Sequence, residues 1–146
     1  MSIFHEKYSH ASIIRRVWDH MDDKNDLLQY GIRSGQKEEF EFMREHDTQA
    51  TSLEECISRL TALSNDRPIY MTLDLDFFDP AFFPGTGTPE AGGENFHSFV
   101  KIMKLLSKKN FVGADIVELS PHIDSTGNSS AFASKVVRET LLAMQD

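Results

Sequence analysis

The alternation of apolar runs with helix-spaced apolar residues constrains the fold of this 146-residue chain most strongly. Helices are predicted near residues 11–22, 37–45, 52–63, 96–106 and 132–144, and strands at residues 27–32, 69–75 and 111–119. Ser52 and Glu55 have the spacing of a capping box ahead of the third helix. Strands that alternate with helices of this length predict an α/β fold with three αβα layers and a mostly parallel sheet. We find no repeat or flexible linker, and therefore expect residues 1–146 to form a single domain.

Charge, hydropathy and cysteine content exclude several classes of partner and compartment. The net charge of −8 argues against a nucleic-acid partner, because phosphate binding needs a basic surface. No apolar run approaches the ~20 residues of a membrane helix, and the N-terminus lacks the pattern of a secretory signal. The single cysteine, Cys56, cannot form an internal disulfide and fits a reducing cytoplasm. We expect it on the buried face of a helix.

Two aspartates at the end of a predicted strand are the most informative residues. Side chains alternate along a strand, so Asp74 and Asp76 are expected on the same face. Two carboxylates this close repel each other unless a cation lies between them, and oxygen ligands suit Mg, Mn or Ca. The alternative is a solvated pair that caps the following turn. Asp is unfavourable inside strands, and Asp74 directly follows an apolar run, which favours the metal interpretation.

The segment after the two aspartates, residues 80–93, holds three prolines and four glycines and is predicted to be a loop. Glycine allows its backbone to approach a ligand closely. The loop lacks the lysine of a phosphate-binding P-loop and does not open a helix, which excludes that interpretation. A metal-dependent phosphotransferase or glycosyltransferase also uses paired aspartates. It would need basic residues nearby, and residues 80–93 contain no Lys or Arg.

Residues 74–93 closely resemble the signature of the arginase/agmatinase (ureohydrolase) family. The resemblance lies in the paired aspartates, in Asp79-Pro80, and in the sequence PGTGTPE followed by Gly92-Gly93. That resemblance implies an arginase-like fold and a binuclear manganese site. By the same match, Asp74 would bridge both metals and Asp76 would bind one of them. Thr88 matches a position that contacts the guanidinium group of the substrate.

Segments on either side extend the resemblance from about residue 6 to residue 144. Downstream, the run DIVELSP and then Asp124 resemble the next strand of the family, and Glu118 matches the glutamate that pairs with the guanidinium. A carboxylate suits that role because it accepts parallel N–H bonds from a planar cation. Upstream, residues 6–12 resemble the segment in which His10 would carry protons, and residues 31–35 resemble a strand-loop segment of agmatinases. The other five histidines, His5, His20, His46, His97 and His122, are interpreted as surface or structural residues.

The resemblance also implies that part of the metal site is not in this sequence. The family uses about four aspartates and two histidines as ligands, and only Asp74 and Asp76 match them here. The other ligands belong to motifs that precede the region around His10, so we expect an N-terminal part to be missing. Two carboxylates cannot hold two Mn²⁺ ions in a catalytic geometry. We therefore expect weak metal binding, an exposed sheet edge and little hydrolysis by this chain alone.

The resemblance points to hydrolysis of agmatine, a small cationic guanidino substrate, to putrescine and urea, a reaction of polyamine biosynthesis. Guanidinobutyrase or arginase activity is the alternative within the family, although no anchor for the α-carboxylate and α-amine of arginine is evident. A further alternative is a non-catalytic remnant that acts through assembly, for instance as a homo-oligomer.

Overall fold

The computed structural model describes residues 12–23 and 26–145, which divide into two compact units. The first unit takes in the described residues up to Gln29 together with Gly35–Gln49, and the second takes in Tyr30–Ser34 and the described residues from Ala50 onward. The single-domain organisation stays a prediction. Within the described part of the chain, no helix has both the length and the apolar character needed to span a membrane.

The first unit contains α1 (Ile13–His20) and α2 (Lys37–Glu45), close to the predicted helices at 11–22 and 37–45. Trp18 of α1 is buried and meets Phe42 of α2 edge-on, with 5.1 Å between the ring centroids. The guanidinium of Arg15 lies over the same Phe42 ring. Aromatic packing between the two helices therefore supplies the core of this unit.

The predicted strand at residues 27–32 is shorter in the structure. Only β1 (Gln29–Tyr30) is strand, and it pairs with β2 (Gln49–Ala50). Gly31 follows with a positive φ of 83°, and a Cβ at that position would lie 2.5 Å from the Phe77 ring. The strand ends because the chain turns at a residue that only glycine can occupy there.

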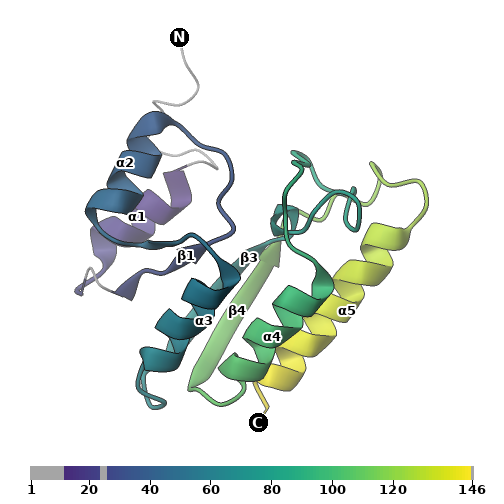
Figure 1. Ribbon diagram of the computed structural model, residues 1–146. Helices are drawn as coiled ribbons and strands as arrows, with labels where there is room; N and C mark the ends of the chain where they lie inside the picture. The colour runs from purple at the N-terminus through teal and green to yellow at the C-terminus, as the bar shows by residue number, and fades with distance from the viewer. Residues whose placement is uncertain (1–11, 24–25, 146) are drawn as a thin grey trace. The chain divides into compact units, whose positions relative to one another are not determined.

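A parallel pair of strands, β3 (Ile69–Asp74) and β4 (Phe111–Val117), is the centre of the second unit (Figure 1). The register runs from Ile69 opposite Phe111 to Asp74 opposite Val117. This pairing confirms the predicted parallel sheet. The carboxyl ends of both strands lie at the same edge, where ligands bind in α/β proteins.

Three helices accompany these strands: α3 (Leu53–Ala62), α4 (Phe96–Leu106) and α5 (Asn128–Ala143). In the second unit α4 packs against both α3 and α5, and α5 contacts β4 (Figure 1). All three begin within a few residues of their predicted starts. The order strand, helix, strand, helix follows from the period of the apolar residues, as the sequence indicates.

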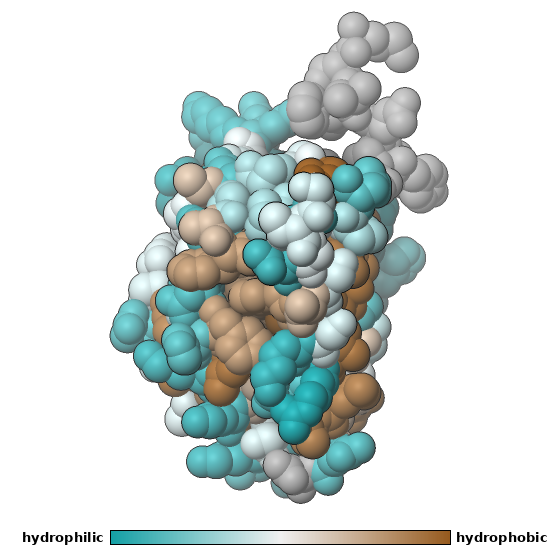
Figure 2. All heavy atoms as spheres, turned by 90° about the vertical axis from the view of Figure 1, so that its right-hand side faces the viewer, coloured by the Kyte–Doolittle hydropathy of each residue, from teal (hydrophilic) through white to brown (hydrophobic). Residues whose placement is uncertain are grey.

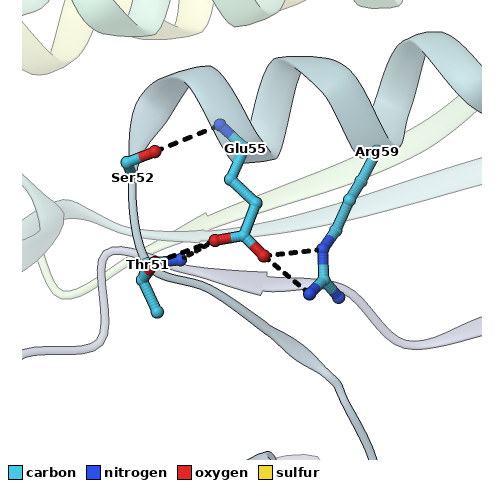
Figure 3. A network of polar contacts seen from close by, with 4 residues as sticks. All are labelled: Thr51, Ser52, Glu55 and Arg59. Carbon is cyan, nitrogen blue, oxygen red and sulfur yellow. Dashed lines mark hydrogen bonds and ion pairs between the residues drawn. The ribbon is translucent and has the colours of Figure 1, made fainter.

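One of the two bonds of the predicted capping box forms at the start of α3 (Figure 3). The Ser52 hydroxyl accepts a hydrogen bond from the Glu55 backbone N–H at 3.2 Å, as expected. The Glu55 carboxylate accepts instead from the N–H and the hydroxyl of Thr51, both at 2.8 Å, and from the Arg59 guanidinium. Thr51 offers two donors to one carboxylate, which explains why the return bond goes to Thr51 and not to Ser52. Cys56 follows on the buried face, where burial raises the pKa of its thiol to about 11.

An aromatic cluster fixes the segment after β3 to the helices. Phe78 packs against Phe132 of α5 and Phe99 of α4, with ring centroids 4.7 and 5.9 Å apart, and Phe83 also meets Phe132. Phe77, Phe78 and Phe83 are buried, whereas Phe82 is 51% exposed. The cluster therefore anchors the start of the loop at residues 80–93 to α4 and α5.

Apolar and polar side chains are exposed on two surfaces of the second unit. Tyr70 (63% exposed), Thr72 and Asp74 project from one face of β3. Exposed apolar residues of α5 and its C-cap are Val137, Leu141, Leu142 and Met144. Figure 2 looks onto the side where α5 lies and shows apolar side chains gathered there among polar ones.

Candidate metal and substrate site

The two predicted metal ligands lie at the end of β3, but not both in the strand. The strand ends at Asp74, and Leu75–Phe77 form a turn of 3-10 helix. The Asp74 carboxylate accepts a hydrogen bond from the Asp76 backbone N–H at 3.0 Å and so caps this turn. Leu75 and Phe77 are buried on either side of Asp76. The predicted strand at 69–75 is thus one residue too long, and a capped turn brings the two carboxylates together in place of strand alternation.

The Asp74 carboxyl shows electrostatic strain from burial and from its acidic neighbours. Its pKa is raised to about 6, first by partial burial and then by the negative charges of Asp76 and Glu118, while the Asp76 N–H bond opposes the rise. Desolvation and like charges both disfavour the carboxylate form. A perturbed carboxyl with acidic partners at the carboxyl edge of a sheet is a candidate for a functional site.

The loop at residues 80–93 returns to the same place. The Thr88 hydroxyl lies 3.4 Å from Oδ2 of Asp76, within reach of a long hydrogen bond. Thr88 and Gly87 are exposed, whereas Gly85 and Thr86 just before them are buried. The loop therefore presents Thr88 to solvent next to the two aspartates while its preceding residues are held in the interior.

Glu118 completes the group from the neighbouring strand. It directly follows β4 and adopts a left-handed φ of 67°, which is uncommon for a residue with a side chain and concentrates at functional sites. Its Oε2 atom lies 3.8 Å from where a Cβ at Gly87 would be, and its charge acts on Asp74. The structure thus brings together Asp74, Asp76, Thr88 and Glu118. The fifth predicted site residue, His10, lies outside the described residues.

Asp79 closes the base of the loop. Its carboxylate accepts from the N–H groups of Ala81 and Gly92, at 2.9 and 2.8 Å, and these bonds hold the pKa of Asp79 below its usual range. The Asp79 N–H donates to the Glu94 carbonyl at 2.9 Å. A Cβ at Gly93 would lie 2.5 Å from the Asp79 nitrogen, so the two ends of the loop can meet only because residue 93 is glycine.

Arg33 is a contributor to this site that the sequence did not identify. One guanidinium nitrogen donates to the main-chain carbonyls of Asp76 and Glu90, at 2.6 and 3.0 Å, and the other donates to the carbonyl of Gly31. Arg33 therefore ties the turn that carries Asp76 to the far end of the loop that carries Thr88. The available signal was that Arg33 is the one basic residue in the agmatinase-like segment at residues 31–35.

The donors present fit a hard divalent cation in kind but not in number. Asp74 and Asp76 offer carboxylate oxygens, which suit Mn²⁺ or Mg²⁺. Among residues 12–23 and 26–145, no group of three or more His, Cys, Asp or Glu side chains is arranged to hold a metal ion. His20, His46, His97 and His122 are all exposed, in line with their interpretation as surface residues, and His5 lies outside the described range.

Comparisons with known proteins identify a family and several similar members of it. The family model described as "Arginase family" matches residues 2–143. An agmatinase from Bacillus anthracis is 42% identical over 143 residues, 94% of this chain and 48% of the relative. A guanidinobutyrase from Pseudomonas aeruginosa is 32% identical and aligns with 97% of this chain and 48% of its own length.

A solved structure is similar in fold. The crystal structure of a candidate agmatinase from Clostridium difficile superposes with a TM-score of 0.88 at 42% identity, covering 98% of this chain and 53% of the other. This likeness confirms the α/β class predicted from the sequence. The chain spans about half the length of the curated relatives it matches.

Proposed function

The chain belongs to the arginase family, and we propose that its residues form the C-terminal half of an agmatinase-like enzyme that hydrolyses a guanidino compound. The observation that carries this proposal is the meeting of Asp74, Asp76, Thr88 and Glu118 at the carboxyl edge of β3 and β4. Each side chain comes from a segment that matches the family motifs. The preferred substrate is agmatine, with putrescine and urea as products.

Asp74 and Asp76 would bind manganese in this proposal, as part of a binuclear site. When bound, such metal ions lower the pKa of a water molecule and polarise the carbon that is attacked. The raised pKa of Asp74 supports a cation at this position, because a positive charge would relieve the repulsion by Asp76 and Glu118.

Glu118 and Thr88 would bind and orient the guanidinium group. The Glu118 carboxylate can accept two N–H bonds from one planar cation, and the Thr88 hydroxyl can accept a third. Both side chains are exposed, and Oε2 of Glu118 lies 3.8 Å from where a Cβ at Gly87, the residue before Thr88, would be. His10 would carry protons, a role suited to imidazole near neutral pH.

The incomplete ligand set governs what this chain does alone. Two carboxylates from the described residues would bind one hard cation weakly and would not fix two. We therefore propose that the isolated chain has little or no hydrolase activity. The expected consequence is a metal affinity well below that of an intact relative.

Substrate choice within the family follows the similarity to the Bacillus anthracis agmatinase, with guanidinobutyrase activity as the alternative supported by the Pseudomonas aeruginosa relative. A titration of the ¹⁵N-labelled chain with agmatine, 4-guanidinobutyrate and arginine tests this order. We expect amide shifts at Thr88 and Glu118 that are largest for agmatine. Shifts confined to arginine would contradict the agmatinase assignment.

A non-catalytic role through assembly is the second candidate, and the lack of a third metal ligand in residues 12–23 and 26–145 favours it. Exposed apolar residues on α5 would be available to a second copy of the chain. Light scattering on the purified chain distinguishes a monomer from a homo-oligomer. The proposed location is the cytoplasm, in polyamine biosynthesis, and rests on the agmatinase assignment and the single free cysteine.

A further inference from the structure

The peptide of Gly85 is hydrogen-bonded on both sides within the second unit. Its N–H donates to the Ser129 hydroxyl at the start of α5, at 2.9 Å, and its carbonyl accepts from the Ser120 N–H at 2.8 Å. A Cβ at Gly85 would lie 2.6 Å from the Ser129 Cβ, so this approach needs glycine. The loop is therefore clamped between α5 and the segment that follows β4.

Asp124 orients the Ser129 hydroxyl that accepts the bond from Gly85. The Ser129 hydroxyl donates its proton to Oδ2 of Asp124 at 2.7 Å. A hydroxyl has one proton, so the Ser129 oxygen is left as an acceptor for the Gly85 N–H. Asp124 and Ser129 are 7% and 0% exposed. Because both residues are buried, the hydrogen bonds from Gly85 to Ser129 and from Ser129 to Asp124 adopt a single arrangement.

The Asp124 carboxylate is held in place by a full set of donors. Oδ1 accepts from the N–H and hydroxyl of Thr126, and Oδ2 also accepts from the Ser129 N–H at 2.8 Å. These bonds keep the pKa of Asp124 well below its usual range, so that the group is a carboxylate at neutral pH.

The clamp joins the chain close to both residues proposed to bind the guanidinium. Thr88 is three residues after Gly85, and Glu118 is two residues before Ser120. We propose that Asp124, acting through the Ser129 hydroxyl, is a positioning residue that sets the spacing between Thr88 and Glu118. This inference rests on the proposed function, because it assigns those two residues to the substrate.

Substitutions separate this role from general stability. Ser129→Ala removes the acceptor and leaves the buried Gly85 N–H without a partner. Asp124→Asn keeps the shape of the side chain but has one acceptor oxygen in place of two, so the donors of Thr126 and Ser129 cannot all be satisfied. Ser134→Ala is the matched control, because the Ser134 hydroxyl is exposed on the same helix and bonds only the Ser130 carbonyl.

The experiment records NMR spectra of the ¹⁵N-labelled chain and these variants. Three quantities are measured: exchange of the Gly85 and Ser120 amides, affinity for agmatine from shifts at Thr88 and Glu118, and broadening by Mn²⁺ at Asp74 and Asp76. In Ser129→Ala we expect amide exchange to rise about tenfold. We expect agmatine affinity to fall at least about fivefold with the Mn²⁺ broadening unchanged. In Asp124→Asn we expect a smaller fall in agmatine affinity, again with unchanged Mn²⁺ broadening. Ser134→Ala should match the parent chain in all three quantities.

The outcome depends on whether agmatine affinity changes while Mn²⁺ broadening does not. A parallel loss of both would show a general structural role, and unchanged agmatine affinity with faster Gly85 exchange would show that the clamp does not position the site. Either result overturns the proposal. If the parent chain shows no agmatine shifts, the proposed function fails. The nuclear Overhauser contact between Gly87 and the Glu118 side chain then tests the clamp, because it should weaken in Ser129→Ala and persist in Ser134→Ala. Should Ser129→Ala fail to fold, Asp124→Asn decides by the same measurements.

Discussion

The two carboxylates that hold the loop and the Asp74 carboxyl at the end of β3 behave in opposite ways. Asp79 and Asp124 each accept several N–H or hydroxyl donors, and both have a pKa below the usual range. Asp74 lies between Asp76 and Glu118, and its pKa is raised to about 6. Residues of one chemical type, no more than 50 positions apart, are therefore stabilised as anions in one region and destabilised in the other.

The difference separates a scaffold, whose carboxylates are stabilised by hydrogen bonds, from a candidate site in which the carboxylate form of Asp74 is disfavoured. The residues that anchor the loop, among them Arg33, Asp79, Asp124 and Phe78, find their partners inside the second unit. At the end of β3, by contrast, the negative charges of Asp76 and Glu118 act on Asp74 and disfavour its carboxylate form. Changes to the scaffold should therefore cost stability, and changes to the candidate site should alter binding.

The largest effect on stability is expected from Phe78→Ala. Phe78 is buried and packs against Phe99 and Phe132, so its truncation leaves a cavity at the point where the loop meets α4 and α5. We expect the free energy of unfolding to fall by about 3 to 5 kcal/mol in urea denaturation. Phe82→Ala is the control, because that ring is half exposed and should change stability by about 0.5 kcal/mol or less. Equal losses in the two variants would contradict the packing assigned to this cluster.

Arg33→Met should have an intermediate effect. It leaves the carbonyls of Gly31, Asp76 and Glu90 without their donor, which we expect to lower the free energy of unfolding by about 1 to 3 kcal/mol. The comparison variant is Arg59→Met, which breaks a partly exposed pair with Glu55 worth about 0.5 kcal/mol. Denaturation curves for both variants test the order. A smaller loss for Arg33→Met than for Arg59→Met would remove Arg33 from the scaffold.

The pH dependence of stability distinguishes the two kinds of carboxyl. For Asp74 the folded-state pKa exceeds the unfolded value of 3.8, so the folded chain binds more protons between pH 4 and about 6 and loses stability as pH rises through that window. Asp74→Asn should remove this loss, which we expect to be of order 1 kcal/mol after allowance for solvent screening. Asp79 and Asp124 have the opposite sign, because their lowered pKa values contribute stability that is lost as pH falls below about 4. Urea titrations of the metal-free chain from pH 3 to 8 measure both slopes, and identical profiles for Asp74→Asn and the parent chain would contradict the electrostatic strain at Asp74.

The smallest effect on stability is expected from Thr88→Val. The Thr88 side chain is exposed and makes one long hydrogen bond to Asp76, so the free energy of unfolding should change by about 0.5 kcal/mol or less. Agmatine shifts at Glu118 should nevertheless weaken, because the guanidinium loses an acceptor. Thr61→Val on α3, whose hydroxyl bonds the Ile57 carbonyl away from the loop, is the control for agmatine binding. Equal agmatine affinity in the two variants would remove Thr88 from the site.

Sequence alone predicted the elements that depend on local period and the residues that carry family motifs. The helix at 37–45, the strand from Ile69 and the paired aspartates all follow from short patterns. The contribution of Arg33 could not be predicted, because it reaches carbonyls more than 40 residues away. The same holds for the bond from Gly85 to Ser129, 44 residues on. The turn that ends β3 at Asp74 was missed because Leu75 continues the apolar pattern while the backbone is already capped.

The measurement that tests the central claim most directly is the manganese content and urea release of the purified chain after incubation with Mn²⁺ and agmatine, with Asp74→Asn as the control. The account predicts weakly held metal that is lost on dialysis, lower still in the variant, and little or no urea. Two tightly bound Mn²⁺ ions with steady urea production would contradict it, because these residues would then complete the site on their own.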